Sequence, residues 1–161
     1  MHTVSFLVEN QPGVLFNVSN LFRRRGFNID SITVGALEDS RYSRMTITVE
    51  ADPRTLNNLL EQLDKMVEVV KVKRLDPLRI VRREMLLVKL STRDPMARED
   101  ALRLINNQHG LVLDIDEDNI MAEVSGTPEE LDQFLDYVKS VGVVEMSRTG
   151  VTALEKGRLK L

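Results

Sequence analysis

At 161 residues, with 42% hydrophobic and 29% charged side chains, the chain has the balance of a folded globular protein and room for one ordinary domain or two small ones. Its 22 Lys and Arg against 25 Asp and Glu give a net charge of −3, without the basic surplus that neutralises nucleic-acid phosphates, and the lack of cysteine excludes disulfides and thiolate chemistry. No apolar run approaches the roughly 20 residues of a membrane helix, and no targeting segment is recognisable, so we expect a cytoplasmic protein.

The first half of the chain alternates between strand and helix patterns. Four stretches have strand patterns, at residues 3–8, 32–37, 41–50 and 67–75. Two have the apolar period of a helix, at residues 13–25 and 52–66. Asp52 is placed to cap the second helix, with Pro53 at its first position, where a missing N–H costs nothing. The resulting order is βαββαβ.

The same order recurs after a charged stretch that contains a proline. Strand patterns cover residues 84–92, 110–116, 119–126 and 143–151, and helical patterns cover residues 95–109 and 127–140. Each half matches the ferredoxin-like motif, an antiparallel four-stranded sheet with two helices on one face. We therefore predict an α+β protein of two tandem ferredoxin-like βαββαβ domains, at residues 1–76 and 84–161, with a linker at 77–83.

The predicted first helix has one apolar face and a basic last turn. Four apolar side chains at helical spacing share one stripe: Val14, Val18, Leu21 and Phe22. The three arginines at 23–25 complement the negative end of the helix dipole, and Gly26 suits the position after the helix. We expect the stripe to pack on the sheet and the arginines to lie in solvent rather than to hold a specific anion or partner.

A polar loop leads into this helix. Gly13 would let a ligand approach the backbone closely, and the free N–H groups of the first helical turn favour an anion such as a carboxylate. Asn10 supplies both a hydrogen-bond donor and an acceptor. An asparagine and a glycine before a helix are also common turn and cap residues, and Asn28 after the helix suits loop geometry. The residues alone leave both interpretations open.

Side chains that carry chemistry are sparse. The two histidines, His2 and His109, predict no metal site or proton relay, and no nucleophile with a paired base is visible. Residues 114–119 imitate the start of a calcium loop, but Asn119 replaces the glycine and Ser125 stands where the glutamate ligand belongs. We expect a hairpin turn there. Without a phosphate-loop or dinucleotide pattern, the sequence predicts no catalytic residue and no cofactor or metal site in this chain.

RNA binding is another function class to weigh, because the ferredoxin-like fold also serves RNA-recognition domains. Residues 23–29 superficially resemble one of their motifs, but Asn28 and Ile29 stand where a small residue and a second aromatic are needed. The predicted strand at 41–50 has a single aromatic, Tyr42, near its start. With 4% aromatic residues and a negative net charge, RNA binding is disfavoured.

Five blocks of sequence together resemble a known family. They cover residues 8–34, 43–49, 82–90, 126–135 and 147–154. In this order they are similar to the regulatory small subunit of acetohydroxyacid synthase, also called acetolactate synthase, whose first domain is an ACT domain. The resemblance extends over nearly the whole chain, and the ordered set is far more specific than an Asn-x-x-Gly loop alone.

The resemblance implies a non-catalytic subunit. Its expected partner is the catalytic large subunit, which would hold thiamine diphosphate and Mg²⁺, and this chain would raise the partner's activity and confer feedback inhibition by a branched-chain amino acid, usually valine. Which branched-chain amino acid binds is left open. The alternative is a stand-alone ACT-type amino-acid sensor that acts on a different partner.

The resemblance also implies an effector site. Asn10 and the backbone of Gly13, Val14 and Leu15 would hold the carboxylate and ammonium groups of the amino acid. In this family the site lies between two ACT domains, so residues 28–29 (Asn28 and Ile29) would come from the neighbouring protomer. We therefore expect a homodimer formed through the first domain.

Overall fold

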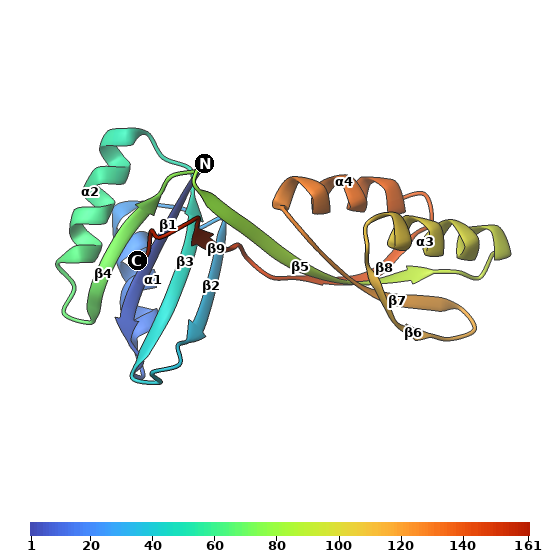
Figure 1. The fold of residues 1–161 in the computed structure, drawn as a ribbon, viewed down its shortest axis with the longest axis horizontal. Coiled ribbons are helices and arrows are strands. Elements are labelled where there is room, and N and C mark those ends of the chain that lie inside the picture. Colours follow the sequence, from blue (N-terminus) through green and yellow to red (C-terminus); the bar gives the residue numbers. More distant parts are fainter. The chain divides into compact units, whose positions relative to one another are not determined.

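The chain is divided into two compact units. The computed structural model describes residues 1–161; the first unit combines Met1–Val81 with Gly150–Leu161, and the second comprises Arg82–Thr149 (Figure 1). The structure differs here from the predicted boundaries, which assigned the whole of 84–161 to a second domain. Residues 150–161 belong to the first unit instead, because they pack and form hydrogen bonds on its sheet. The predicted linker at 77–83 includes the start of a strand, β5.

The first unit has the predicted βαββαβ order. Its elements are β1 (His2–Glu9), α1 (Val14–Arg25), β2 (Ser31–Ala36), β3 (Tyr42–Val49), α2 (Pro53–Asp64) and β4 (Val69–Leu75). The four strands form an antiparallel sheet in the order β2-β3-β1-β4. Buried side chains of both helices share one core with the sheet, so α1 and α2 cover the same face. This arrangement confirms the ferredoxin-like fold.

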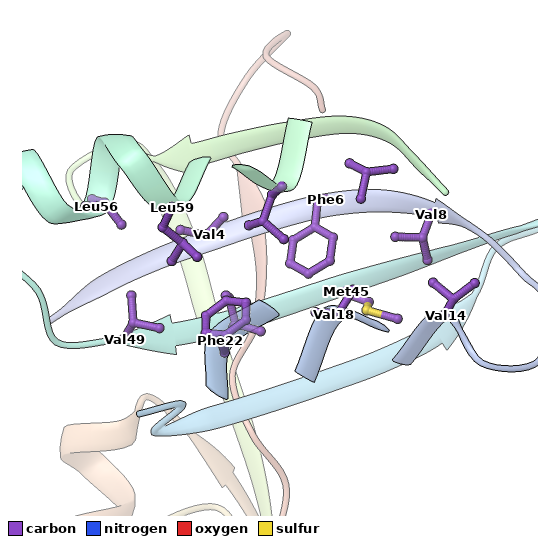
Figure 2. Close-up of a cluster of buried hydrophobic side chains, with 13 residues drawn as sticks. Val4, Phe6, Val8, Val14, Val18, Phe22, Met45, Val49, Leu56 and Leu59 are labelled. Atoms are coloured by element: carbon purple, nitrogen blue, oxygen red, sulfur yellow. The ribbon is translucent and has the colours of Figure 1, made fainter. Parts of the chain in front are cut away.

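Alternation along the central strands sorts their side chains onto the two faces of this sheet. Figure 2 shows Phe6 of β1 among the apolar side chains on the helix side, where Phe22 of α1 also lies. Both rings are essentially fully buried, and burying such a side chain contributes about 1.5–3 kcal/mol. Val14 and Val18 complete the buried α1 stripe, whereas Leu21 lies at its margin and is only partly buried.

The opposite face of the first sheet carries hydroxyl side chains. They are Thr3, Ser5, Ser31, Thr33, Thr46 and Thr48. The Ser31 and Thr48 hydroxyl oxygens are 2.8 Å apart across the β2–β3 ladder. A short strand, β9 (Thr152–Glu155), returns to this face and pairs with β5 (Ile80–Ser91). The sequence patterns did not predict β9.

The second unit repeats the fold. After β5 it contains α3 (Pro95–Asn107), β6 (Leu111–Ile115), β7 (Asn119–Gly126), α4 (Pro128–Val138) and β8 (Val143–Arg148), with strand order β6-β7-β5-β8. Its core joins β5, β7 and both helices around Phe134. Thr127 and Glu130 form a capping box at the start of α4. The expected hairpin turn is confirmed between β6 and β7, where the Asp116 carboxylate accepts hydrogen bonds from the backbone N–H groups of Asp118 and Asn119.

Arg148 anchors the end of β8 within the second unit. Its Nε donates to Glu84 Oε2 at 2.6 Å, its Nη1 donates to Asp132 Oδ1 at 2.6 Å, and its Nη2 donates to the Pro128 carbonyl oxygen at 3.1 Å. Burial acts to lower the pKa of Arg148, but the hydrogen bonds with Asp132 and Glu84 outweigh it and raise that pKa. The network joins β8 to β5 and α4.

Replacing Arg148 with Met should destabilise the second unit by on the order of 3 kcal/mol, because the buried Glu84 carboxylate loses its partner. Arg103→Met is the matched control, since its ion pair with Asp100 is largely exposed and such pairs contribute about 0–1 kcal/mol. Hydrogen exchange of the β5 and β7 amides measures both effects. Equal protection in the two variants would contradict the prediction.

Candidate functional site

The loop between β1 and α1 presents the open end of a helix. Gly13 occupies the N-cap position with φ of 90°, a left-handed conformation that favours glycine, and nothing lies within 4 Å of where its Cβ would be. It provides no side-chain cap, and the first turn contains no acidic residue. The Val14 N–H donates to the Gln11 carbonyl at 3.4 Å, whereas the N–H groups of Leu15 and Phe16 remain available to an anion from outside the helix.

The first turn of α1 combines this polar end with exposed apolar side chains. Val14 is buried in the core, whereas Leu15 is 48% exposed and Phe16 is 70% exposed. The family resemblance in the sequence predicts a ligand role for Leu15 and assigns none to Phe16. The available signal was its position outside the buried stripe of α1, because a large aromatic on the exposed side of a helix is a candidate for contact with a ligand or partner.

Asn10 is held by the turn that connects β2 and β3. Its backbone N–H donates to the Arg41 carbonyl at 2.7 Å, and its Nδ2 donates to the Ser40 carbonyl at 2.9 Å. The turn is closed by an ion pair in which Arg41 Nη2 and Asp39 Oδ2 are 2.6 Å apart, and the hydrogen bonds from Arg41 lower the pKa of Asp39. Because the Asn10 amide nitrogen is engaged, Oδ1 is the atom left to accept a hydrogen bond from a ligand.

Asn28 and Ile29 lie at the other end of α1. The helix ends at Gly26, which has φ of 71°, and exposed Asn28 donates from Nδ2 to Asp30 Oδ1 at 3.3 Å. Ile29 is half-buried against the core. The 12 residues of α1, at 1.5 Å each, separate the two predicted halves by roughly 18 Å. The structure thus places Asn10, Gly13 and Leu15 in the loop and first turn at one end of α1, and residues 28–29 at its other end within the same chain.

The half at residues 28–29 leads directly into an edge strand. β2 begins at Ser31 and pairs only with β3, so its other edge has no partner strand in this chain. Val34, on that strand, is 47% exposed. An exposed strand edge with an apolar side chain is a ready template for pairing with a second chain.

Other parts of the chain gather no comparable set of groups. A cavity of about 440 Å³ lies along α1 and α2, where Asn17 donates to Glu68 at 2.6 Å and Arg25 donates to Gln62 at 3.0 Å, but Asn10 and Gly13 do not line it. No cluster of three or more His, Asp or Glu side chains is arranged to hold a metal ion. None of the helices is long and apolar enough to cross a membrane.

Comparisons with known proteins agree over nearly the full length. The family descriptions "AHAS small subunit-like ACT domain" and "Small subunit of acetolactate synthase" match residues 4–71 and 83–157. The probable acetolactate synthase small subunit of Methanothermobacter thermautotrophicus is 40% identical, over 97% of this chain and 93% of that protein. The acetolactate synthase small subunit of Mycolicibacterium smegmatis is 38% identical, over 97% and 91%.

A solved structure extends the agreement to three dimensions. The crystal structure of the acetolactate synthase small subunit from Thermotoga maritima is 39% identical and superposes with a TM-score of 0.91, covering 98% of each chain. These findings confirm the resemblance drawn from the five sequence blocks. The chain belongs to the acetolactate synthase small-subunit family, and its first unit carries the ACT domain of that family.

Proposed function

We propose that this chain is a non-catalytic regulatory subunit that binds the large catalytic subunit of acetohydroxyacid synthase, raises its activity and makes it sensitive to a branched-chain amino acid, with valine as the first candidate. The thiamine diphosphate and Mg²⁺ of the reaction belong to the partner. The observation that carries the regulatory assignment is the uncapped start of α1 beside Asn10, in a chain of this family.

The chemistry of this loop matches the two charged groups of an amino acid. The effector carboxylate accepts hydrogen bonds from the first-turn N–H groups of Leu15 and Phe16, where the helix dipole also favours negative charge. The ammonium group donates to Oδ1 of Asn10, the atom that the β2–β3 turn leaves free. The branched side chain packs against apolar groups such as Leu15 and, from the second protomer, Ile29.

The site is completed by two chains. Since α1 separates the two halves, one amino acid contacts both only if residues 28–29 come from a neighbouring protomer. Pairing of two β2 edges side by side would join the sheets of two first units and remove an exposed edge from each. An effector held by both protomers stabilises one dimer geometry over others, which is the differential affinity that allosteric control requires.

The proposed function predicts two effects on the purified catalytic subunit. Adding this chain should increase acetolactate production from pyruvate in the presence of thiamine diphosphate and Mg²⁺, and valine should then inhibit. This chain alone should produce no acetolactate, since no catalytic constellation is present. Absence of any increase would count against the assignment, and increase without inhibition by valine, leucine or isoleucine would count against the effector site.

Gly13→Asp and Gly13→Asn are a matched test of the carboxylate site. The two side chains have the same size, an added Cβ meets nothing within 4 Å, and Asn and Asp tolerate left-handed backbone better than other non-glycine residues. Only Asp places a negative charge where the effector carboxylate binds. We expect Gly13→Asp to abolish valine inhibition, a loss of about 5- to 150-fold in differential affinity, with activation retained.

Valine titration of the reconstituted enzymes measures this difference. The Gly13→Asn variant should still be inhibited, at a higher half-inhibitory valine concentration than the wild type. Circular dichroism establishes that both variants are folded. Unchanged valine sensitivity in the folded Asp variant would move the effector site away from this loop.

Dimerisation through β2 is tested on the full chain. Val34→Lys should weaken the dimer at least tenfold, because it places a desolvated charge in the joined sheet edge, and each 1.4 kcal/mol is a factor of ten. Val67→Lys is the control: Val67 is 91% exposed and lies outside β2. Sedimentation velocity over a concentration series compares the two variants. Identical self-association would exclude this edge as the interface.

A further inference from the structure

The C-terminal segment of the first unit is fastened to β2. Within the strap, which we define as residues 150–155, the backbone N–H of Val151 donates to Ser31 Oγ at 3.3 Å and its carbonyl accepts from Thr33 Oγ1 at 2.8 Å. Two hydroxyl side chains of β2 thus bind both polar groups of one strap residue.

The contact at the start of the strap is also close. A Cβ added at Gly150 would lie 2.9 Å from the carbonyl oxygen and 3.0 Å from the nitrogen of Ile32, both backbone atoms of β2. Real Cβ atoms essentially never approach backbone so closely, so only glycine lets the strap lie directly on this strand. The strap therefore contacts β2 through main chain and side chains together.

The rest of the strap is held by β3 and β4. Arg44 Nη2 donates to the Ala153 carbonyl at 3.0 Å, and Lys73 Nζ donates to Glu155 Oε2 at 2.6 Å. The Glu155 side chain is only 5% exposed, and two cations compensate its burial: Lys73, which is bonded to it, and the nearby Arg44 guanidinium. Val151 and Ala153 are buried in a small apolar cluster with β4 and β5.

β2 is the strand on which the proposed effector site depends. It begins two residues after Ile29 and carries the free edge proposed for pairing. On one side it is fixed by the β3 ladder, and on the hydroxyl face by the strap. Within the first unit the strap is therefore placed to determine how well β2 and the half at residues 28–29 are ordered.

We infer that the strap positions β2, and with it the Asn28–Ile29 half-site and the pairing edge, so that the response to the effector depends on the strap contacts while activation does not. This inference rests on the proposed function. A loosened strap lowers the fraction of molecules with β2 in its binding arrangement, and the apparent effector affinity falls by that fraction. Thr33 and Lys73 thereby act as positioning residues without touching the effector.

The first test compares Thr33→Val with Thr33→Ser in the reconstituted enzyme. Valine at residue 33 keeps the size and β-branching of threonine but removes the hydroxyl donor to Val151, whereas serine keeps it. We expect Thr33→Val to raise the half-inhibitory valine concentration roughly two- to tenfold, the range that one hydrogen bond carries. Thr33→Ser should have the half-inhibitory valine concentration of the wild type. Without valine, both variants should activate the catalytic subunit fully.

A charge exchange tests the other end of the strap. Lys73→Glu and Glu155→Lys should each raise the half-inhibitory concentration, because like charges then face each other. The double variant should restore it in part, because a lysine at position 155 regains an opposite charge at 73 but also faces Arg44. Identical valine titrations for Thr33→Val and Thr33→Ser, a lowered half-inhibitory concentration, or a double variant no better than the single ones would overturn the inference. Loss of activation would also overturn it, since the strap would then belong to the contact with the catalytic subunit.

The strap and the effector site can fail separately. If the wild-type reconstituted enzyme responds to no branched-chain amino acid, the proposed function fails whatever the variants do. Hydrogen exchange of the β2 amides in the uncomplexed chain then still tests the strap, with faster exchange expected in Thr33→Val than in Thr33→Ser. Equal exchange in the two variants would show that the strap does not order β2.

Discussion

The packing of α1 across its sheet is the constraint on which the site depends. The buried stripe at Val14, Val18 and Phe22 packs the helix on the sheet from its first turn to its last, and so sets where each end of α1 lies. One end is opened by the left-handed Gly13, and the other leads through Gly26 into the edge strand β2. The helix therefore separates its uncapped N-terminus from the unpaired edge of β2 by a distance that one small ligand cannot span within one protomer. In the proposed function, one effector molecule must therefore contact two protomers, so that binding it stabilises one arrangement of the dimer.

The two faces of the first sheet differ in the side chains they carry and in the kind of segment that covers them. The helix face is apolar, because helices bury side chains but offer no backbone hydrogen bonds to a sheet. The opposite face is rich in Ser and Thr, and an extended segment lying there presents backbone N–H and C=O groups that need partners. Ser31 and Thr33 satisfy both groups of Val151, which an apolar face could not do. The hydroxyl face is thus matched to an extended covering segment rather than to a helix or to solvent.

The order of elements was readable from the sequence, because apolar periodicity and caps are local signals. The α1 stripe, the Asp52 cap and the turn at 116–119 all follow from a few neighbouring residues, and all three are present. The strap was not readable. Its strand has four residues, and its partners on β2 lie more than 100 positions away in the sequence. The predicted strand at 143–151 is too long for the same reason, because β8 ends at Arg148. No local pattern distinguishes the residues that pair in the second sheet from those that follow in the strap.

For the candidate site, the sequence indicates the loop residues but not the residues that hold them in place. Asn10 and Gly13 belong to a recognisable block, but the role of the β2–β3 turn depends on a hydrogen bond from Asn10 to a backbone carbonyl, which any residue at position 40 could offer. A residue that accepts a hydrogen bond only through its backbone carbonyl can have any side chain, so its sequence letter does not reveal this role. The same holds for Gly150, whose requirement arises from the backbone of Ile32 rather than from a turn of its own.

Regulation by such a chain needs little energy, which explains why it carries so few reactive groups. An allosteric coupling of about 1–3 kcal/mol is enough to change effector affinity between two states by 5- to 150-fold. A net hydrogen bond contributes about 0.5–1.5 kcal/mol, so the few contacts between the strap and β2 already reach the required scale. Contacts much stronger than these would hold β2 in one arrangement whether or not effector were bound, and the differential affinity would vanish. In the proposed function, the hydroxyl and backbone partners of moderate strength that join the strap to β2 therefore suit a segment whose order responds to ligand occupancy.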